Sequence, residues 1–390
     1  MPTKSTRAAC GIRVVASTLS TEDAICAARA ELADGVFQHI LVFFSTRHEP
    51  NALIAALKEN FPDVTFSGCS TAGEVGPLGM TQDGIVLIAF PEIGFRVMSE
   101  VIPDIAKGGV ERASEIARRL RVQMITGVSR AAKENIFALV LVDGLSDREE
   151  PLTAALHWSL DDMELLGGSA GDGLAFHKTA LIHRGELIRG GAILFVIETA
   201  TPFRVFKTQN FEPTPIKLVV TAADNENRIV YDLNAEPAAS EYASTIGVPV
   251  EDLGPMSFAA YPLVVKVGGE YYGRAIRNMN PDGSLSFFCA IDEGLVFTVG
   301  RPRDMVQSTL ETLKQIDADL GGIDFVLGFD CILRRLDAET GQLRHKVEEI
   351  YERYGLAGFH TYGEQFNAMH LNQTLTGIAF SKPPAKTSPP

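Results

Sequence analysis

Strand-like and helix-like segments alternate along the first half of the chain, and this pattern constrains the fold more than any other feature of the sequence. Short apolar runs predict strands at residues 12–16, 39–44, 64–67 and 136–142. Amphipathic patterns among them predict helices at residues 21–35, 51–60 and 108–122. Two apolar runs at 83–90 and 93–102, separated by Pro91 and Glu92, predict a β-hairpin. Strands alternating with helices of this length are typical of α/β layers.

The second half is richer in strands, and its helices are fewer. We therefore expect an α/β and α+β protein of two domains, with mixed β-sheets flanked by helices and a ligand cleft between or beside them. No internal repeat is evident in the sequence. We expect a strand–helix extension at 1–34 that packs on a first domain at 35–233. A second domain at 234–380 and a proline-rich disordered tail at 381–390 follow.

Charge and composition exclude several classes of protein. The chain has 35 Lys and Arg against 49 Asp and Glu, a formal net charge of −14, which disfavours binding to nucleic acid. No apolar run approaches the roughly 20 residues that span a bilayer, and no secretory signal is present, so we expect no membrane insertion and a cytoplasmic location. The five cysteines are widely spaced and form no Cys-x-x-Cys pair, which argues against a disulfide framework or a zinc knuckle.

A first glycine-containing motif, residues 68–74, directly follows a predicted strand. Small residues there allow a sharp turn that exposes backbone amides to a ligand. Its candidate pocket residues are Cys69, Ser70, Thr71 and Glu74. The alternative is a tight connection with the Cys69 side chain packed inside.

A second motif, residues 167–173, contains Gly-x-Ser-x-Gly, the pattern of a hydrolase nucleophile elbow. Ser169 and Asp172 are its candidate pocket residues, and Asp330 followed by His360 or His370 would complete the hydrolase order. An elbow and a phosphate-binding loop both require strand, turn and helix, and no long helix follows here. The alternative is a glycine-rich turn that lines a pocket.

A third polar and aromatic run spans residues 358–365 and 370–374. Such a run is costly to bury unless its groups bond to each other or to a ligand. Its candidate pocket residues are Tyr362, Glu364 and Asn372. The eight histidines contain no metal-binding pair at helical spacing, and His183, His360 and His370 are individually typical of hydrogen-bonded side chains. Trp158, the only tryptophan, is expected in the core.

Together, "GCSTAGEV", "GGSAGDGLAFHKTALIHRGELIRGGAILFVI" and "GFHTYGEQFNAMHLNQTLTGIAF" resemble the FIST family, from about residue 35 to residue 380. The resemblance implies an N-terminal FIST domain (35–233), a C-terminal FIST domain (234–380) and a bacterial sensory protein rather than an enzyme. Members are thought to bind small molecules, amino acids among them. Stand-alone members of this size resemble haem-based nitric oxide sensors of the NosP type, which regulate a partner histidine kinase.

Three functions follow as expectations. The first is a haem b sensor of nitric oxide, with His183 and then His370 or His360 as the iron ligand and a histidine kinase or other signalling protein as the partner. The second is a sensor of an organic ligand such as an amino acid, bound through Ser70, Thr71, Ser169 and Asp172. The third is a serine hydrolase that uses Ser169. The two sensor functions involve no catalytic residue. The sequence leaves open whether the chain forms a homodimer.

Overall fold

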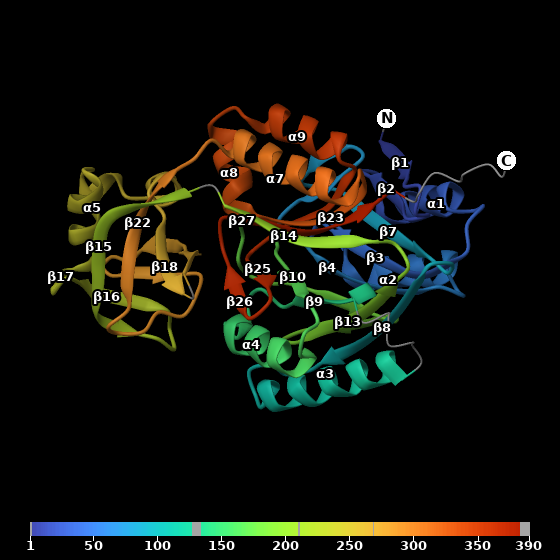
Figure 1. The fold of residues 1–390 in the computed structure, drawn as a ribbon, viewed down its shortest axis with the longest axis horizontal. Coiled ribbons are helices and arrows are strands. Elements are labelled where there is room, and N and C mark those ends of the chain that lie inside the picture. The colour runs from blue at the N-terminus through green and yellow to red at the C-terminus, as the bar shows by residue number, and fades with distance from the viewer. Residues whose placement is uncertain (1, 127–133, 210, 268, 383–390) are drawn as a thin grey trace.

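The computed structural model describes residues 2–126, 134–209, 211–267 and 269–382. It consists of a body of three sheets and a separate fourth sheet beside it (Figure 1). The expected class, mixed sheets flanked by helices, is confirmed. No helix in the described part of the chain is long and apolar enough to cross a membrane.

Three successive parts of the body repeat one order of elements: a strand, a helix, a parallel strand–helix–strand unit, a short hairpin and a closing strand. The first repeat contains β2 (Arg13–Ser17), α1 (Thr21–Glu31), β3 (Phe37–Phe44), α2 (Pro50–Asn60), β4 (Thr65–Ser70), β5 (Glu74–Gly76), β6 (Gly79–Thr81) and β7 (Ile85–Pro91). The second contains β8 (Phe95–Ile102), α3 (Gly109–Thr126), β9 (Ile136–Val142), α4 (Glu149–Leu160), β10 (Leu165–Ser169), β11 (Leu181–His183), β12 (Glu186–Ile188) and β13 (Ala192–Thr199).

The third repeat begins with β14 (Phe203–Gln209) and resumes after a long insertion. Its remaining elements are α7 (Met305–Leu320), β23 (Ile323–Cys331), α8 (Ile332–Thr340), α9 (Arg344–Arg353), β24 (Leu356–Thr361), β25 (Glu364–Phe366), β26 (Met369–Leu371) and β27 (Thr374–Ser381). The strand β1 (Thr3–Arg7) is added at one edge of the first sheet.

The three sheets have the same strand order and exchange their hairpins. Their orders are β2-β7-β3-β4-β11-β12, β8-β13-β9-β10-β25-β26 and β14-β27-β23-β24-β5-β6. The two outer strands of each sheet therefore come from another repeat, so the body has approximate threefold symmetry. The repeat that the sequence did not reveal is thus present in the structure. The predicted hairpin at 83–102 is wrong, because β7 belongs to the first sheet and β8 to the second.

One glycine recurs at the same position in each repeat and has a steric reason. Gly68, Gly167 and Gly358 lie on the second parallel strand of their repeats. A Cβ atom there would lie 1.7, 2.0 and 1.8 Å from a backbone carbonyl oxygen of the neighbouring strand. No side chain fits at such a distance, so glycine is required at these three positions.

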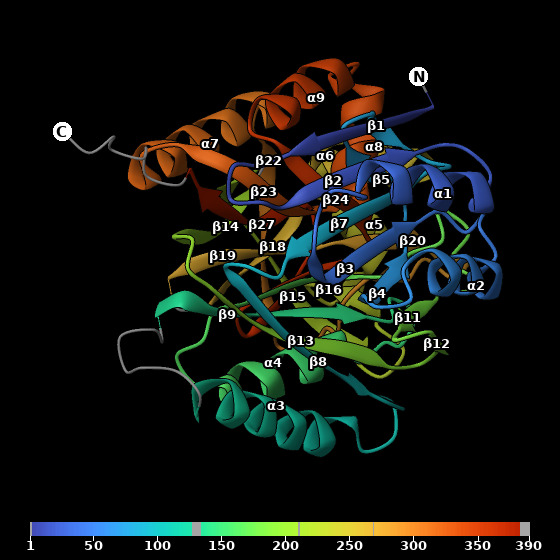
Figure 2. The ribbon, with the colours of Figure 1, turned by 90° about the vertical axis from the view of Figure 1, so that its right-hand side faces the viewer.

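The main core lies where the three sheets face one another. Phenylalanines from different sheets meet there, such as Phe43 with Phe359 (ring centroids 4.6 Å apart) and Phe137 with Phe380 (6.0 Å). Helices α1 and α2, α3 and α4, and α7 and α9 cover the outer faces on three sides (Figure 2).

The insertion between β14 and α7, hereafter the insertion domain, forms its own sheet of eight strands. Its elements are β15 (Phe211–Asp224), β16 (Ile229–Leu233), β17 (Glu236–Pro237), α5 (Ala238–Ile246), the short 3-10 helix η2 (Val250–Asp252), α6 (Pro255–Ala260), β18 (Leu263–Val267), β19 (Glu270–Arg274), β20 (Ile276–Met279), β21 (Leu285–Phe287) and β22 (Val296–Pro302). It has a separate apolar core.

The expected domain limits can be placed on this architecture. The boundary at 233/234 falls at the end of β16, inside the insertion domain. The extension 1–34 supplies β1, β2 and α1 of the first sheet and its cover. In the expected disordered tail, Ser381 closes β27, and residues 383–390 lie outside the described residues.

Candidate functional site

The three motifs singled out in the sequence meet around the pseudo-threefold axis. Each motif donates a backbone N–H to the next and accepts one from the third. The bonds are Gly171 N–H to the Ser70 oxygen (3.0 Å), Tyr362 N–H to the Ser169 oxygen (3.2 Å) and Ala72 N–H to the His360 oxygen (2.9 Å). Ser70, Ser169 and His360 thus occupy equivalent positions in the three repeats.

Polar side chains gather on one face of the second sheet, where it passes into the exchanged hairpin β25–β26. Alternate residues of a strand share a face, so Gln365, His370 and Asn372 lie with Ser169 on the face that α4 covers. The Gln365 Nε2 atom donates to the Ser169 hydroxyl (2.9 Å) and lies 3.1 Å from His370 Nδ1. All four side chains are at most 2% exposed.

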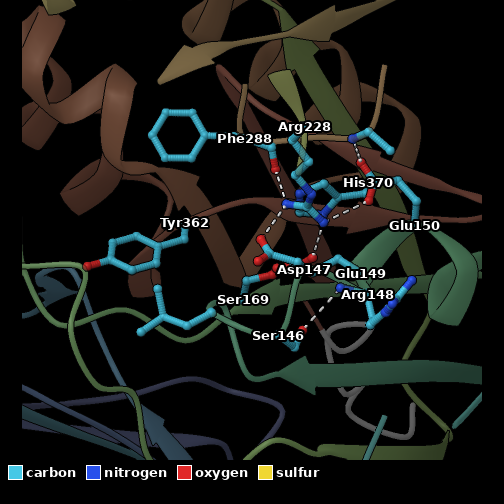
Figure 3. A network of polar contacts seen from close by, with 12 residues as sticks. Ser146, Asp147, Arg148, Glu149, Glu150, Ser169, Arg228, Phe288, Tyr362 and His370 are labelled. Carbon is cyan, nitrogen blue, oxygen red and sulfur yellow. Dashed lines mark hydrogen bonds and ion pairs between the residues drawn. The ribbon is translucent and has the colours of Figure 1, made fainter. Parts of the chain in front are cut away.

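The insertion domain completes this cluster with Arg228, at the turn between β15 and β16. Its guanidinium contacts the carboxylates of Glu149 (2.7 Å), Glu150 (3.2 Å) and Asp147 (3.3 Å) and donates to the Phe288 carbonyl, as Figure 3 shows. The other Glu150 oxygen accepts the Ala290 N–H (3.0 Å). We call the region formed by Glu149, Glu150, Ser169, Arg228, Gln365, His370 and Asn372 the junction site.

Two further contacts hold the hairpin against the insertion domain. Arg274 Nη1 donates to the His370 carbonyl (3.3 Å). A Cβ atom on Gly273 would lie 2.8 Å from the Asn372 carbonyl oxygen, so the two backbones pass closely. The junction site therefore lies between two separately folded parts of the chain, which is a common location for ligand sites.

Burial sets the charges at the junction. Burial raises the pKa of Glu149 to about 7, although Arg228 opposes the shift. Burial also opposes ionisation of Glu150, but His370 and Arg228 lower its pKa below the usual range. Because burial lowers the pKa of His370 to about 4, the ring is neutral at pH 7 and Arg228 is then the cation facing Glu150.

Two buried acceptors at the junction have no hydrogen-bond partner among the described residues: Gln365 Oε1 and Asn372 Oδ1. Gln365 is 0% exposed and Asn372 is 1% exposed. A buried unsatisfied polar atom costs about 1–3 kcal/mol, so native proteins rarely leave one without a ligand or an ordered water. At the junction site each of these two oxygens therefore lacks a donor among the described residues.

Thr71, Glu74 and Glu364 are held by neighbours within their own repeat, and Cys69 is packed in the core. Thr71 donates to Glu74 (2.6 Å), and Thr361 donates to Glu364. Burial raises the pKa of Glu74 to about 7 and that of Glu364 to about 8. Cys69 lies in the main core, where burial raises its thiol pKa.

Ser70 and Asp172 organise the loop after β10. The Ser70 hydroxyl accepts the Ala180 N–H (3.0 Å). The Asp172 carboxylate accepts the backbone N–H groups of residues 176, 177 and 178, each at 2.8 Å, and the hydroxyl of Tyr362. Phe176 stacks on Tyr362, with centroids 4.6 Å apart. These contacts saturate the Asp172 carboxylate and give it a structural role.

The three histidines expected as haem ligands lie at separate places. His183, on β11, is 2.8 Å from Ser67 through Nδ1. His360 is 0% exposed, and neither ring nitrogen has a hydrogen bond within the described residues; Nδ1 is 3.6 Å from Asp330. His360 and His370 are both tightly enclosed: a Cβ on Gly73 would lie 3.1 Å from His360 Cδ2, and one on Gly363 would lie 2.1 Å from His370 Cε1.

The hydrolase arrangement differs from a triad in two respects. Gln365 lies between Ser169 and His370, and Asp330 is bound by Arg334 (2.6 Å) and Tyr351 (2.8 Å). β10 leads through a loop into β11 rather than into a helix. Ser169 therefore lacks both the base contact and the strand–turn–helix geometry of an elbow.

Sequence reasoning missed four residues of the junction site: Glu149, Glu150, Arg228 and Gln365. Gln365 lies inside the polar run that was singled out, so its composition was a usable signal. The two glutamates lie at the start of α4, a helix that was not predicted, and Arg228 stands 79 residues from Glu149, so no local pattern connects them.

This architecture defines a class of protein: an α/β body of three repeats with hairpin exchange and a β-rich domain inserted into the third repeat. Comparison with known protein families finds two that match this chain. A model of the FIST N domain matches residues 38–236, and one of the FIST C domain matches residues 238–367. The chain belongs to the FIST family.

One relative can be aligned with most of this chain. The chain is 24% identical over 393 residues to the uncharacterized protein MJ1623 of Methanocaldococcus jannaschii, covering 90% of this chain and 75% of the relative. Both FIST domains expected from the motifs are thus present, and the division between the two family matches falls within the insertion domain.

Proposed function

We propose that this protein is a sensor that binds a small molecule carrying an amino group at the junction site. The observation that carries the proposal is a pair of buried acceptors, Gln365 Oε1 and Asn372 Oδ1, for which the described part of the chain supplies no donor. They lie beside residues from both the body and the insertion domain. A ligand there would contact both parts.

The charges of the site favour a donor. Three carboxylates, from Asp147, Glu149 and Glu150, share the single guanidinium of Arg228. An ammonium group would satisfy the amide oxygens and lie near these carboxylates, whereas a purely anionic ligand would face like charges. An amino acid carries such an ammonium group, and Arg274 is the nearby cation for its carboxylate.

Signal transmission would follow from the position of the site. The insertion domain is connected to the body by two segments, β14–β15 and β22–α7. A ligand bound between the body and the insertion domain would favour some relative orientations of these two parts over others. A histidine kinase or another signalling partner would respond if it binds those orientations with different affinity.

Haem b sensing of nitric oxide places a different demand on the structure. It requires an imidazole with a free nitrogen beside a large apolar pocket. His360 has the free nitrogens, but its ring is enclosed by Asp330, Gly73 and Arg335, and the His370 ring abuts Gly363. His183 bonds to Ser67 through Nδ1, and its side chain is only 7% exposed on β11, between strands β4 and β12. The surroundings of His360 and His370 do not fit a macrocycle in this conformation, which favours an organic ligand.

The test is a thermal-shift screen of the twenty amino acids and simple amines against the wild-type protein. We expect stabilisation by one or a few of them, lost in Gln365→Leu and retained in Gln315→Leu, a change at an exposed glutamine on α7. Equal stabilisation of Gln365→Leu would contradict binding at the junction site.

Two additional measurements separate the other functions. A Soret band at one haem per chain that shifts with nitric oxide, and vanishes in one of the histidine variants, would replace our proposal with gas sensing. Labelling by a serine-reactive fluorophosphonate that disappears in Ser169→Ala would replace it with hydrolysis.

A further inference from the structure

Trp158, expected in the core, is instead 79% exposed on α4. Its ring makes an edge contact with His157, with ring centroids 5.4 Å apart. Exposed tryptophan is rare on a surface that meets only water, because burial of its large ring is strongly favourable. Trp158 therefore marks a place where another molecule can gain contact area.

The tryptophan borders a hollow of about 330 Å³. We call it the Trp158 hollow; it is lined by His157, Trp158, Asp161, Asp162, Met163, Glu164 and Asn367. Asp161 is paired with Arg121. Asp162 and Glu164 form no ion pair with any residue that the structure describes, and Arg204 acts on Glu164 only at longer range. The rim therefore has two carboxylates without a directly bonded cation.

We propose that the Trp158 hollow is a docking surface for an arginine or lysine side chain of a partner protein. An indole ring attracts a cation through its quadrupole, and the carboxylates that line the same hollow add the attraction of their negative charge. Most of the lining residues are exposed, so the hollow contacts one side of its occupant. This suits a side chain projecting from a protein surface, whereas a small free cation is normally enclosed.

The Trp158 hollow and the junction site share two structural elements. Helix α4 starts with Glu149 and Glu150, which hold Arg228, and its last turn carries Trp158. Asn367, at the turn of the β25–β26 hairpin, lines the hollow and accepts the Leu165 N–H (3.2 Å), while the same hairpin carries Gln365 and His370. A partner at the hollow would therefore contact the elements that a junction ligand orders, a coupling that rests on the proposed function.

The fluorescence of Trp158 provides the test, since it is the only tryptophan of the chain. The probes are a short synthetic peptide of alternating arginine and glycine, its glutamate counterpart and tetramethylammonium. We expect a saturable change in emission with the arginine peptide and none with the glutamate peptide. An equally saturable response to tetramethylammonium, at the same concentrations, would overturn the choice of a protein side chain.

Matched variants locate the binding. Asp162→Asn combined with Glu164→Gln should weaken binding of the arginine peptide by about threefold or more at low salt. Glu59→Gln, at an exposed acid on α2, should leave it unchanged. Equal binding by both variants would overturn the proposal. Titration of Gln365→Leu with the arginine peptide separates this proposal from the proposed function. The peptide should still bind at the Trp158 hollow of this variant even if the junction site binds no ligand.

Discussion

Arg228 of the insertion domain lies 2.7 Å from the carboxylate of Glu149, at the first turn of α4 in the body. Their side chains are only 8% and 3% exposed. Removal of one partner from a buried ion pair leaves the other charge without compensation, which is far more costly than the loss of an exposed pair. This contact therefore holds the insertion domain against helix α4 of the body.

We expect Arg228→Met to lower the free energy of unfolding by about 3 kcal/mol, because Glu149 and Glu150 then remain buried without their cation. Urea denaturation would measure the loss. The double variant Arg228→Met with Glu149→Gln should recover part of it, since the buried charge is removed. A single variant as stable as the wild type would show that the ion pair does not hold the two parts together.

Glu364 gives a prediction about pH. Burial raises its pKa to about 8 in the folded protein, from an ordinary value of about 4.3. Between these values the folded protein holds a proton that the unfolded chain has released, so this group destabilises the fold as pH rises from about 5 to 8. Relative to wild type, Glu364→Gln should therefore gain up to about 1.4 kcal/mol of unfolding free energy per pH unit over that range.

Chemical denaturation of both proteins at several pH values would measure this difference. The contributions of Glu74 and of the buried histidines are common to both proteins and cancel. Glu59→Gln, an exposed substitution, should show no such trend. A difference between Glu364→Gln and wild type that stays constant with pH would mean that Glu364 is ionised in the fold.

Gly167→Ala tests the steric basis of the repeat. Its new Cβ would lie 2.0 Å from the Val140 carbonyl oxygen, so the two parallel strands must separate. We expect a loss of stability above about 3 kcal/mol or a failure to fold. Gly254→Ala is the control, since nothing lies within 4 Å of its Cβ position; as the N-cap of α6 it should lose only about 1 kcal/mol or less. Similar stabilities for the two variants would contradict the close approach.

Local patterns in the sequence predicted many elements of the body. The strand at 136–142 has the bounds of β9, and the helices expected at 51–60 and 108–122 correspond to α2 and α3. These elements bury one face or lie wholly in the core, so their periodicity is strong. The hairpins β5–β6 and β25–β26 have strands of three residues, too short for a period, and they were not predicted.

The repeat escaped sequence analysis because only the sterically required glycine is common to all three copies. Gly-x-x-Thr-x-Gly-Glu recurs at 68–74 and 358–364, but the second repeat has Ala170, Asp172 and Gly173 at the last conserved positions. Gly68, Gly167 and Gly358 recur, but the equivalent residues two positions later are Ser70, Ser169 and His360. The Ser70 and Ser169 hydroxyls bond to residues of another repeat, Ala180 and Gln365, whereas His360 lies near Asp330 of its own repeat. The third repeat is also interrupted by the insertion domain, which separates β14 from α7 by residues 211–302.

The candidate site was predicted only in part, for a related reason. Composition singled out His370 and Asn372 because a buried polar run needs partners. Trp158 was misplaced because α4 was not recognised, so its position on the exposed side of a helix could not be seen. Arg228 binds acids from a distant part of the chain, and only the folded structure brings them together.

Hydrogen–deuterium exchange with and without a millimolar mixture of the twenty amino acids tests the central claim most directly. The account predicts slower exchange in peptides that cover residues 363–373, 146–151 and 226–230, which contain the junction site. No protection in these peptides, or protection confined to another region, would contradict ligand binding between the body and the insertion domain.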